Sequence, residues 1–229
     1  MLKGYGAVIL DGAWLTLQLA LSSMALAIVL GLIGVALRLS PVRWLAWLGD
    51  LYSTVIRGIP DLVLILLIFY GGQDLLNRLA PLLGYDDYID LNPLVAGIGT
   101  LGFIFGAYLS ETFRGAFLGI PKGQAEAGAA YGMSNLQVFF RIMVPQMIRL
   151  AIPGFTNNWL VLTKATALIS VVGLQDMMVK AKQAADATRE PFTFFLAVAA
   201  LYLVLTSVSL LALKYLEKRY SVGVKVVEL

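Results

Sequence analysis

Residues 120–132 read IPKGQAEAGAAYG and residues 142–146 read IMVPQ. Residues 124–131 favour a helix, because alanine, the best helix former, occupies four of these eight positions. Gly132 suits the left-handed residue that ends many helices, and Ser134 is a good N-cap for a second helix. The stretch therefore predicts a helix-turn-helix, which fits either docking on a partner protein or lying on a lipid surface.

Apolar segments lie on both sides of this stretch. Hydrophobic residues make up 59% of the 229 positions and charged residues only 14%, which is too few for the surface of a soluble domain. A helix needs about 20 apolar residues to cross a bilayer. We therefore expect an all-α integral membrane protein with one transmembrane domain over residues 1–229. Its five predicted spans cover about 12–37, 55–78, 93–115, 153–175 and 191–214.

Three of these spans have alternatives. The uncharged run at 62–73 is short, and the run at 150–175 contains Lys164, so each also fits a re-entrant or buried segment. The first span contains an Ala-Leu-Ala triplet at 25–27, which would suit a signal-peptide cleavage site. Because the apolar run continues to Leu37, we expect a retained helix instead.

The distribution of lysine and arginine predicts the orientation, because cytoplasmic loops carry an excess of both. With the 116–152 connection on one side, nine basic residues lie on that side and five on the other. The richer side holds Arg38, Arg43, Lys122, Arg141, Arg149, Lys214, Lys218, Arg219 and Lys225, and the poorer side holds Lys3, Arg78, Lys180, Lys182 and Arg189. The N-terminus is therefore expected outside and the C-terminus in the cytoplasm.

Several classes of chemistry are disfavoured by residues that the sequence lacks. The chain has no cysteine and no histidine, which are the commonest ligands of zinc and, for histidine, the commonest proton carrier. We expect no metal site, no catalytic residues and no enzyme activity. No Gly-Lys dipeptide occurs, so there is no phosphate-binding loop for ATP. A membrane-embedded enzyme and an ion-coupled secondary transporter remain the alternatives from other classes.

The spacing of Glu126, Ala127, Gly132 and Pro145 resembles the EAA loop of binding-protein-dependent ABC importer permeases. That pattern is EAA, three residues, Gly, nine residues and I-x-L-P; here a glycine replaces the second alanine and a valine replaces the leucine. The resemblance implies a type I importer core, with a cytoplasmic loop over about 118–150. In the family this loop forms a coupling helix that enters a cleft of the ATPase, so these four residues are the expected coupling residues. The alternative is a surface helix without a partner.

The same resemblance implies the partners. They are two ATPase subunits that bind ATP and magnesium, a second homologous permease that forms a heterodimer with this chain, and a periplasmic or surface amino-acid binding protein. The remaining contacts are with the amino acid and membrane lipid, and none is with nucleic acid. This chain itself would carry no cofactor and would lie in the bacterial inner membrane.

Further segments resemble the permeases of polar amino acids, and most of all the Q-type permease subunits of importers for histidine, lysine, arginine and ornithine. The matching segments are 4–6, 57–60, 108–116, 121–124, 164–168 and 219–225, together with Asn158. The resemblance implies import of cationic amino acids, by alternating access. Other polar amino acids, such as glutamine, are the alternative substrates.

Charged side chains inside or at the rim of the spans are the candidate substrate contacts, because such residues usually face a bundle interior or a water-filled path. A cationic amino acid needs excess negative charge, which favours Asp61 for its side chain and Glu111 for its ammonium. Arg57, Arg114 and Lys164 are candidates for its carboxylate. The alternative is structural pairing of Asp61 with Arg57 and of Glu111 with Arg114, with Lys164 pairing to an acid or to a partner subunit.

Small residues recur on the third predicted span at Gly97, Gly99, Gly102 and Gly106. Small residues allow helices to approach closely in lipid, so we expect these four glycines to pack against another helix.

Overall fold

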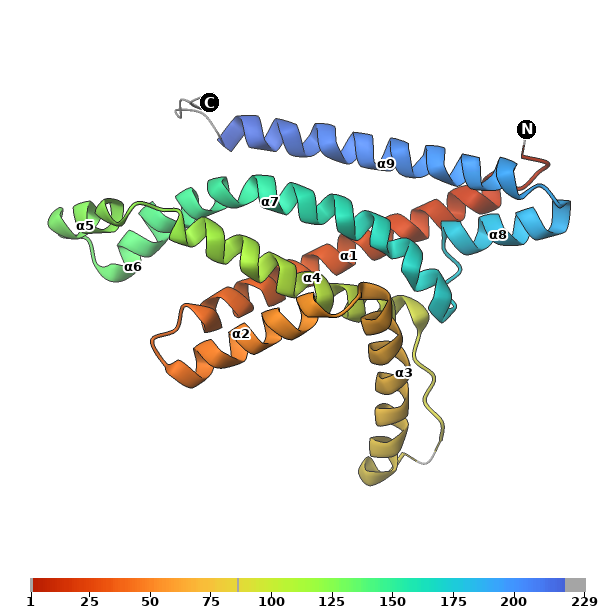
Figure 1. Cartoon of the computed structure of the whole chain (residues 1–229), viewed down its shortest axis with the longest axis horizontal. Helices are drawn as coiled ribbons and strands as arrows, with labels where there is room; N and C mark the ends of the chain where they lie inside the picture. Colours follow the sequence, from red (N-terminus) through yellow and green to blue (C-terminus); the bar gives the residue numbers. More distant parts are fainter. Residues whose placement is uncertain (1, 86, 221–229) are drawn as a thin grey trace.

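The protein is described by a computed structural model that covers residues 2–85 and 87–220. The ordered elements in these two ranges are all helical. Four long helices run between the two ends of the molecule (Figure 1). They are α1 (Gly6–Arg38), α4 (Pro93–Leu118), α7 (Val144–Ala165) and α9 (Pro191–Tyr220). Most of the 219–225 match, including Lys225, lies outside the described residues.

Shorter elements sit around this bundle. Helix α2 (Arg43–Gly58) lies beside α1 and α4, and α3 (Asp61–Leu79) leaves the bundle as an arm (Figure 1). Helices α5 (Lys122–Ala130) and α6 (Asn135–Val138) form one end, and α8 (Met177–Thr188) lies at the other. Three short segments complete the described chain: the 3-10 helices η1 (Ala80–Leu83) and η3 (Thr166–Val172), and the π-helical turn η2 (Phe139–Met143).

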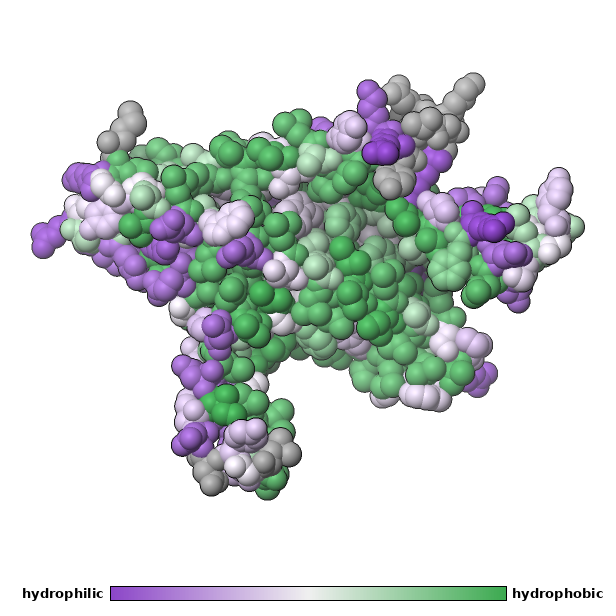
Figure 2. Space-filling view, turned by 180° about the vertical axis from the view of Figure 1, so that it is seen from behind, coloured by the Kyte–Doolittle hydropathy of each residue, from purple (hydrophilic) through white to green (hydrophobic). Residues whose placement is uncertain are grey.

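Five described helical segments are long and apolar enough to cross a membrane. Their bounds are Gly6–Arg38, Asp61–Leu82, Pro93–Leu118, Asn135–Val172 and Pro191–Arg219. Hydrophobic side chains cover the middle of the molecule, and hydrophilic ones gather at its two ends and on the projecting arm (Figure 2). This distribution is the one expected of a surface that faces lipid.

Two helical segments begin at other residues than the predicted spans. The second span begins at Asp61 rather than near residue 55, because α2 ends at Gly58 and Ile59 is extended. Ile59 directly precedes Pro60, and a residue before proline favours the extended conformation. The fourth segment begins near residue 135 rather than 153, because α6, η2 and α7 follow one another without a break. Pro145 falls in the first turn of α7, directly after the π-helical η2.

Helices α1 and α4 make the most extensive contact of the bundle, and glycines contribute to it. A Cβ on Gly102 or Gly106 would lie 2.6–2.7 Å from Leu26 or Leu30 of α1, and one on Gly97 would lie 2.9 Å from Ile169. The predicted packing role is therefore confirmed for these three glycines. It was wrong for Gly99, whose Cβ would meet no atom within 4 Å.

Candidate functional site

Glu111 on α4 contacts three arginines from three different elements. Glu111 accepts a hydrogen bond of 2.6 Å from Arg38 Nη1 and another of 2.6 Å from Arg114 Nη2. Arg57 Nη1 lies 3.4 Å from the same carboxylate. The expected pair of Glu111 with Arg114 is present, but it is one part of a larger cluster. The cluster carries more positive than negative charge around its central carboxylate.

Arg38 is the residue of this cluster that sequence reasoning missed. It lies in the last turn of α1, and its side chain is only 9% exposed. Its Nε donates to Asp50 at 2.7 Å, and its Nη1 lies 3.4 Å from Ser53 Oγ. Asp50 and Ser53 both belong to α2, so Arg38 joins α1, α2 and α4. The sequence marks Arg38 as a basic residue at a span end, and no local spacing links it to Glu111.

Asp61 has a different partner from the one considered in the sequence. It lies in the first turn of α3, where a helix N-terminus favours a negative charge. Tyr108 of α4 donates its hydroxyl proton to Asp61 Oδ1 over 3.4 Å. The guanidinium carbon of Arg57 lies 5.9 Å from the centre of the Tyr108 ring, within cation–π range. Asp61 therefore faces a phenol, and Arg57 turns to Glu111 instead.

A cavity of about 420 Å³ lies between α4 and α7 beside this cluster. It is lined by Arg57, Tyr108, Glu111, Thr112, Gly115, Ala116, Leu150, Gly154, Asn157 and Asn158. Asn158 donates to Thr112 Oγ1 at 3.0 Å, which holds α7 to α4. The walls thus offer guanidinium and amide donors together with a carboxylate, a set that suits a zwitterionic solute.

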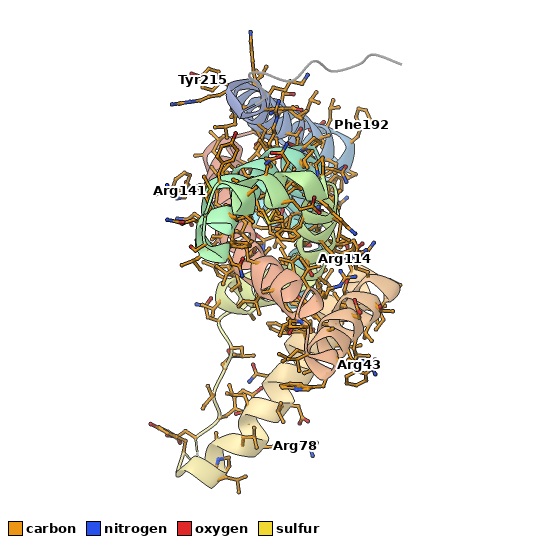
Figure 3. All side chains as sticks on the ribbon, turned by 90° about the vertical axis from the view of Figure 1, so that its left-hand side faces the viewer. Arg43, Arg78, Arg114, Arg141, Phe192 and Tyr215 are labelled. Atoms are coloured by element: carbon orange, nitrogen blue, oxygen red, sulfur yellow. The ribbon has the colours of Figure 1, made fainter. Side chains whose placement is uncertain are left out.

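The other two charged candidates lie differently. Arg114 is on the side of the bundle that also carries Arg43 of α2 (Figure 3), and its buried Nε has no hydrogen-bond partner in the described chain. Lys164 is exposed on α7 and does not line the cavity. Among the described residues, no ion pair to Lys164 is formed. Of the five candidates, only Arg57 and Glu111 line the cavity. Arg114 does not line it but pairs with Glu111, Asp61 is joined to it only through Tyr108, and Lys164 lies apart.

The segment after α4 forms the predicted helix-turn-helix. Gly132 has φ +78°, the left-handed conformation expected at this turn, and the Met133 N–H bonds to the Gly128 carbonyl at 3.1 Å. Ser134 caps α6 through a reciprocal pair of bonds with Gln137. Gly128, which replaces the second alanine of the family pattern, allows α5 to pack closely on η2. A Cβ on Gly128 would lie 2.6 Å from Ile142 Cδ1.

This helix-turn-helix leaves a mixed polar and apolar surface uncovered. Glu126, Ala127 and Pro145 are exposed. Tyr131 is 89% exposed and Leu136 is 69% exposed, although both are large hydrophobic side chains. Exposed apolar groups rimmed by polar ones are typical of a surface that contacts another protein.

Comparison with known proteins places these features in a family. The family model for the binding-protein-dependent transport system inner membrane component matches residues 16–222. Permease protein HisQ of the histidine/lysine/arginine/ornithine transport system of Salmonella typhimurium is 53% identical over 225 residues, 98% of each chain. Permease protein ArtQ of the arginine ABC transporter of Escherichia coli is 35% identical over 221 residues, 91% of this chain and 93% of that one.

Solved structures show the same fold. A crystal structure of an amino acid ABC transporter with histidines has a TM-score of 0.80 and 26% identity, over 94% of this chain and 95% of that one. An inward-facing structure of the MetNI methionine ABC transporter has a TM-score of 0.74 and 20% identity, over 93% of this chain and 96% of the other. The type I importer permease fold predicted from the sequence is therefore confirmed.

Proposed function

The chain belongs to the family of binding-protein-dependent transport system inner membrane components, and from this premise we propose that it carries cationic amino acids into the cell. It is a multi-pass membrane permease subunit of an amino-acid ABC importer, and it is a transport component rather than an enzyme. The substrate class is supported by the names of similar proteins, which handle histidine, lysine, arginine and ornithine, or arginine alone.

The observation that carries the substrate proposal is the unequal pairing of the two acids. Glu111 is surrounded by three arginines, whereas Asp61 contacts, within the described chain, only the neutral hydroxyl of Tyr108. A carboxylate without a cation of its own can offer its charge to a cationic side chain. We assign Asp61 to the substrate side chain and Arg57, beside it above Tyr108, to the carboxylate. Glu111, which lines the cavity, is then left for the ammonium, and Arg114 supports it as its ion-pair partner.

The energy for transport is proposed to reach these helices through α5. Two ATPase subunits, which bind ATP and magnesium, would contact Glu126 and Ala127. Gly132 and Pro145 would set the shape of the segment that joins α5 to α7. A receptor outside the membrane and a second, distinct permease complete the assembly.

Lys164, exposed on α7, would contact the second permease or the solute. The N-terminus would face outward and the C-terminus the cytoplasm. Such a switch requires that ATP and the receptor bind the two states with different affinities.

Transport competition tests the substrate assignment. In vesicles that contain the complete complex, arginine, lysine, histidine and ornithine should compete with one another, and glutamine should not. Asp61→Asn should weaken the preference for cationic over neutral solutes by about 10–100-fold, because a hydrogen bond to a charged group contributes about 1.5–3 kcal/mol. Asp74→Asn, on the same helix, removes an exposed acid paired with Arg78 and should leave the preference unchanged. Equal competition by glutamine in the unmodified complex would contradict the assignment.

A further inference from the structure

A second cavity, of about 970 Å³, lies at the end of the bundle that carries α5. The last turns of α1, α4 and α9 and the first half of α7 enclose it, with η2 beside the opening. Its walls are hydrophobic, and they include Val35 of α1, Phe140 of η2, Ile148 of α7 and Leu213 of α9. The volume is at the upper end of the range for small-molecule pockets, about 300–1,000 Å³. It is separate from the polar cavity at Glu111.

The hydrophobic walls favour binding of a hydrocarbon chain. The lining side chains offer no charged group and no hydrogen-bonding side chain to a polar solute. Phe140 and Ile148 are 60% and 42% exposed, so the cavity opens on the surface that faces lipid. An amino acid would lose its hydration there without compensation, whereas an acyl chain would not.

Basic residues adjoin two of the lining residues in the chain. Arg141 follows Phe140 directly and Lys214 follows Leu213 directly, and both basic residues are exposed. Arg141 and Tyr215, the residue after Lys214, point outward from the same side of the molecule (Figure 3). Glu217 is the acid nearest in sequence on α9. Positive charge beside an apolar groove near a membrane surface matches an anionic lipid headgroup above its chains.

We propose that this cavity binds an anionic phospholipid, with an acyl chain between α1, α7 and α9 and the phosphate toward Arg141 and Lys214. The inference rests on the proposed function in one respect, the placing of this end of the bundle in the cytoplasmic leaflet. The wall that contacts the chain includes Phe139 and Phe140 of η2, the π-helical turn that connects the coupling segment to α7. Isolated π-helical turns are frequent at functional sites. The lipid therefore contacts the segment through which α5 would move α7.

Photolabelling with lipid tests the proposal on the complete complex in vesicles. Phosphatidylglycerol with a diazirine on its acyl chain should label peptides from 139–155 or 210–217, and it should do so at least five times more than the matched phosphatidylcholine. Ala36→Trp places an indole into the cavity from α1 and should abolish this labelling. Val204→Trp, on the exposed surface of α9 outside the cavity, should leave it intact. Arg141→Gln with Lys214→Gln should remove the preference for phosphatidylglycerol while keeping some labelling.

Three outcomes would overturn the proposal: equal labelling by both lipids, labelling that survives Ala36→Trp, or a disulfide from Ile148→Cys to a cysteine placed in the second permease, which would show that a protein covers the cavity. Amino-acid uptake is measured in the same vesicles. If the unmodified complex is labelled by the lipid but does not take up cationic amino acids, the proposed substrate is refuted and the proposed lipid site is not.

Discussion

At the scale of single residues, Glu111 is the point where three helices meet. Its carboxylate is shared by Arg38 of α1, Arg57 of α2 and Arg114 of α4 itself. Arg38 is nearly buried, so its charge depends on Glu111 and Asp50 for compensation. An unpaired charge in such a place is costly, which makes the central carboxylate more important than any one of its partners.

Removing that carboxylate should therefore destabilise the protein. Glu111→Gln keeps the shape of the side chain but leaves three guanidiniums around a neutral amide. We expect a loss of about 1–3 kcal/mol, which is less than for a fully buried pair because Glu111 is 29% exposed. Thermal unfolding in detergent measures it. Asp74→Asn breaks a pair whose side chains are 62% and 75% exposed and should cost about 0.5 kcal/mol or less. Equal effects of the two changes would disprove the central role of Glu111.

At the scale of elements, helix α8 approaches α1 closely at Gly12. A Cβ on Gly12 of α1 would lie 2.7 Å from the Met177 Cα and 2.8 Å from its nitrogen, both backbone atoms that cannot rotate away. Gly12→Ala should therefore destabilise the protein by about 1–3 kcal/mol. Gly99→Ala has open space around its new methyl group and should be neutral or stabilising by up to about 1 kcal/mol. Unfolding curves of the two variants provide the comparison, and a harmless Gly12→Ala would show that α8 does not pack as described.

Asp176, the N-cap of α8, gives this end of the molecule a pH dependence. Its Oδ1 accepts from the Val179 N–H at 3.0 Å, while its Oδ2 is buried without a partner in the described chain. Burial raises the pKa of Asp176 from 3.8 to about 6. The folded state therefore holds this proton more tightly than the unfolded state, and stability should fall as pH rises from about 4 to about 6, then stay level.

Asp176→Asn tests this linkage. Its amide oxygen can still cap Val179, but it does not ionise, so the fall in stability between pH 4 and pH 6 should shrink. The difference is on the order of 3 kcal/mol, because one unit of pKa shift corresponds to about 1.36 kcal/mol. Melting temperatures across this pH range measure it. An unchanged pH profile would mean that Asp176 does not titrate as its burial implies.

The elements that the sequence predicted well are those with local signals. Ala-rich residues, Gly132 and Ser134 predicted α5, its turn and the cap of α6, because capping and helix propensity act within a few residues. Long uncharged runs predicted α1, α4 and α9 for the same reason. Helices α2 and α8 were not predicted, since their stability comes from packing on α1 and α4 or on α1 and α9. The contact of Arg38 with Glu111 joins residues 73 positions apart, and one sequence does not reveal such a pairing.

At the scale of the whole molecule, a series of packing contacts joins the proposed coupling segment to the polar cavity. Helix α5 packs through Gly128 on Ile142 of η2, and η2 continues into α7. Helix α7 forms one wall of the polar cavity, and its Asn158 is bonded to Thr112 of α4. We therefore expect a displacement of α5 to reach the cavity through η2 and α7.

The most direct measurement of the central claim is a cross-link from α5 to the ATPase subunit. The chain has no cysteine, so Ala127→Cys creates a single thiol on the exposed face of α5. The account predicts that a short thiol cross-linker joins this position to the ATPase in the assembled complex, and that ATP changes the yield. Lys182→Cys, on α8 at the opposite end of the bundle, should give no such product. Labelling of the Ala127→Cys thiol from outside the cell, with no cross-link to the ATPase, would contradict the account.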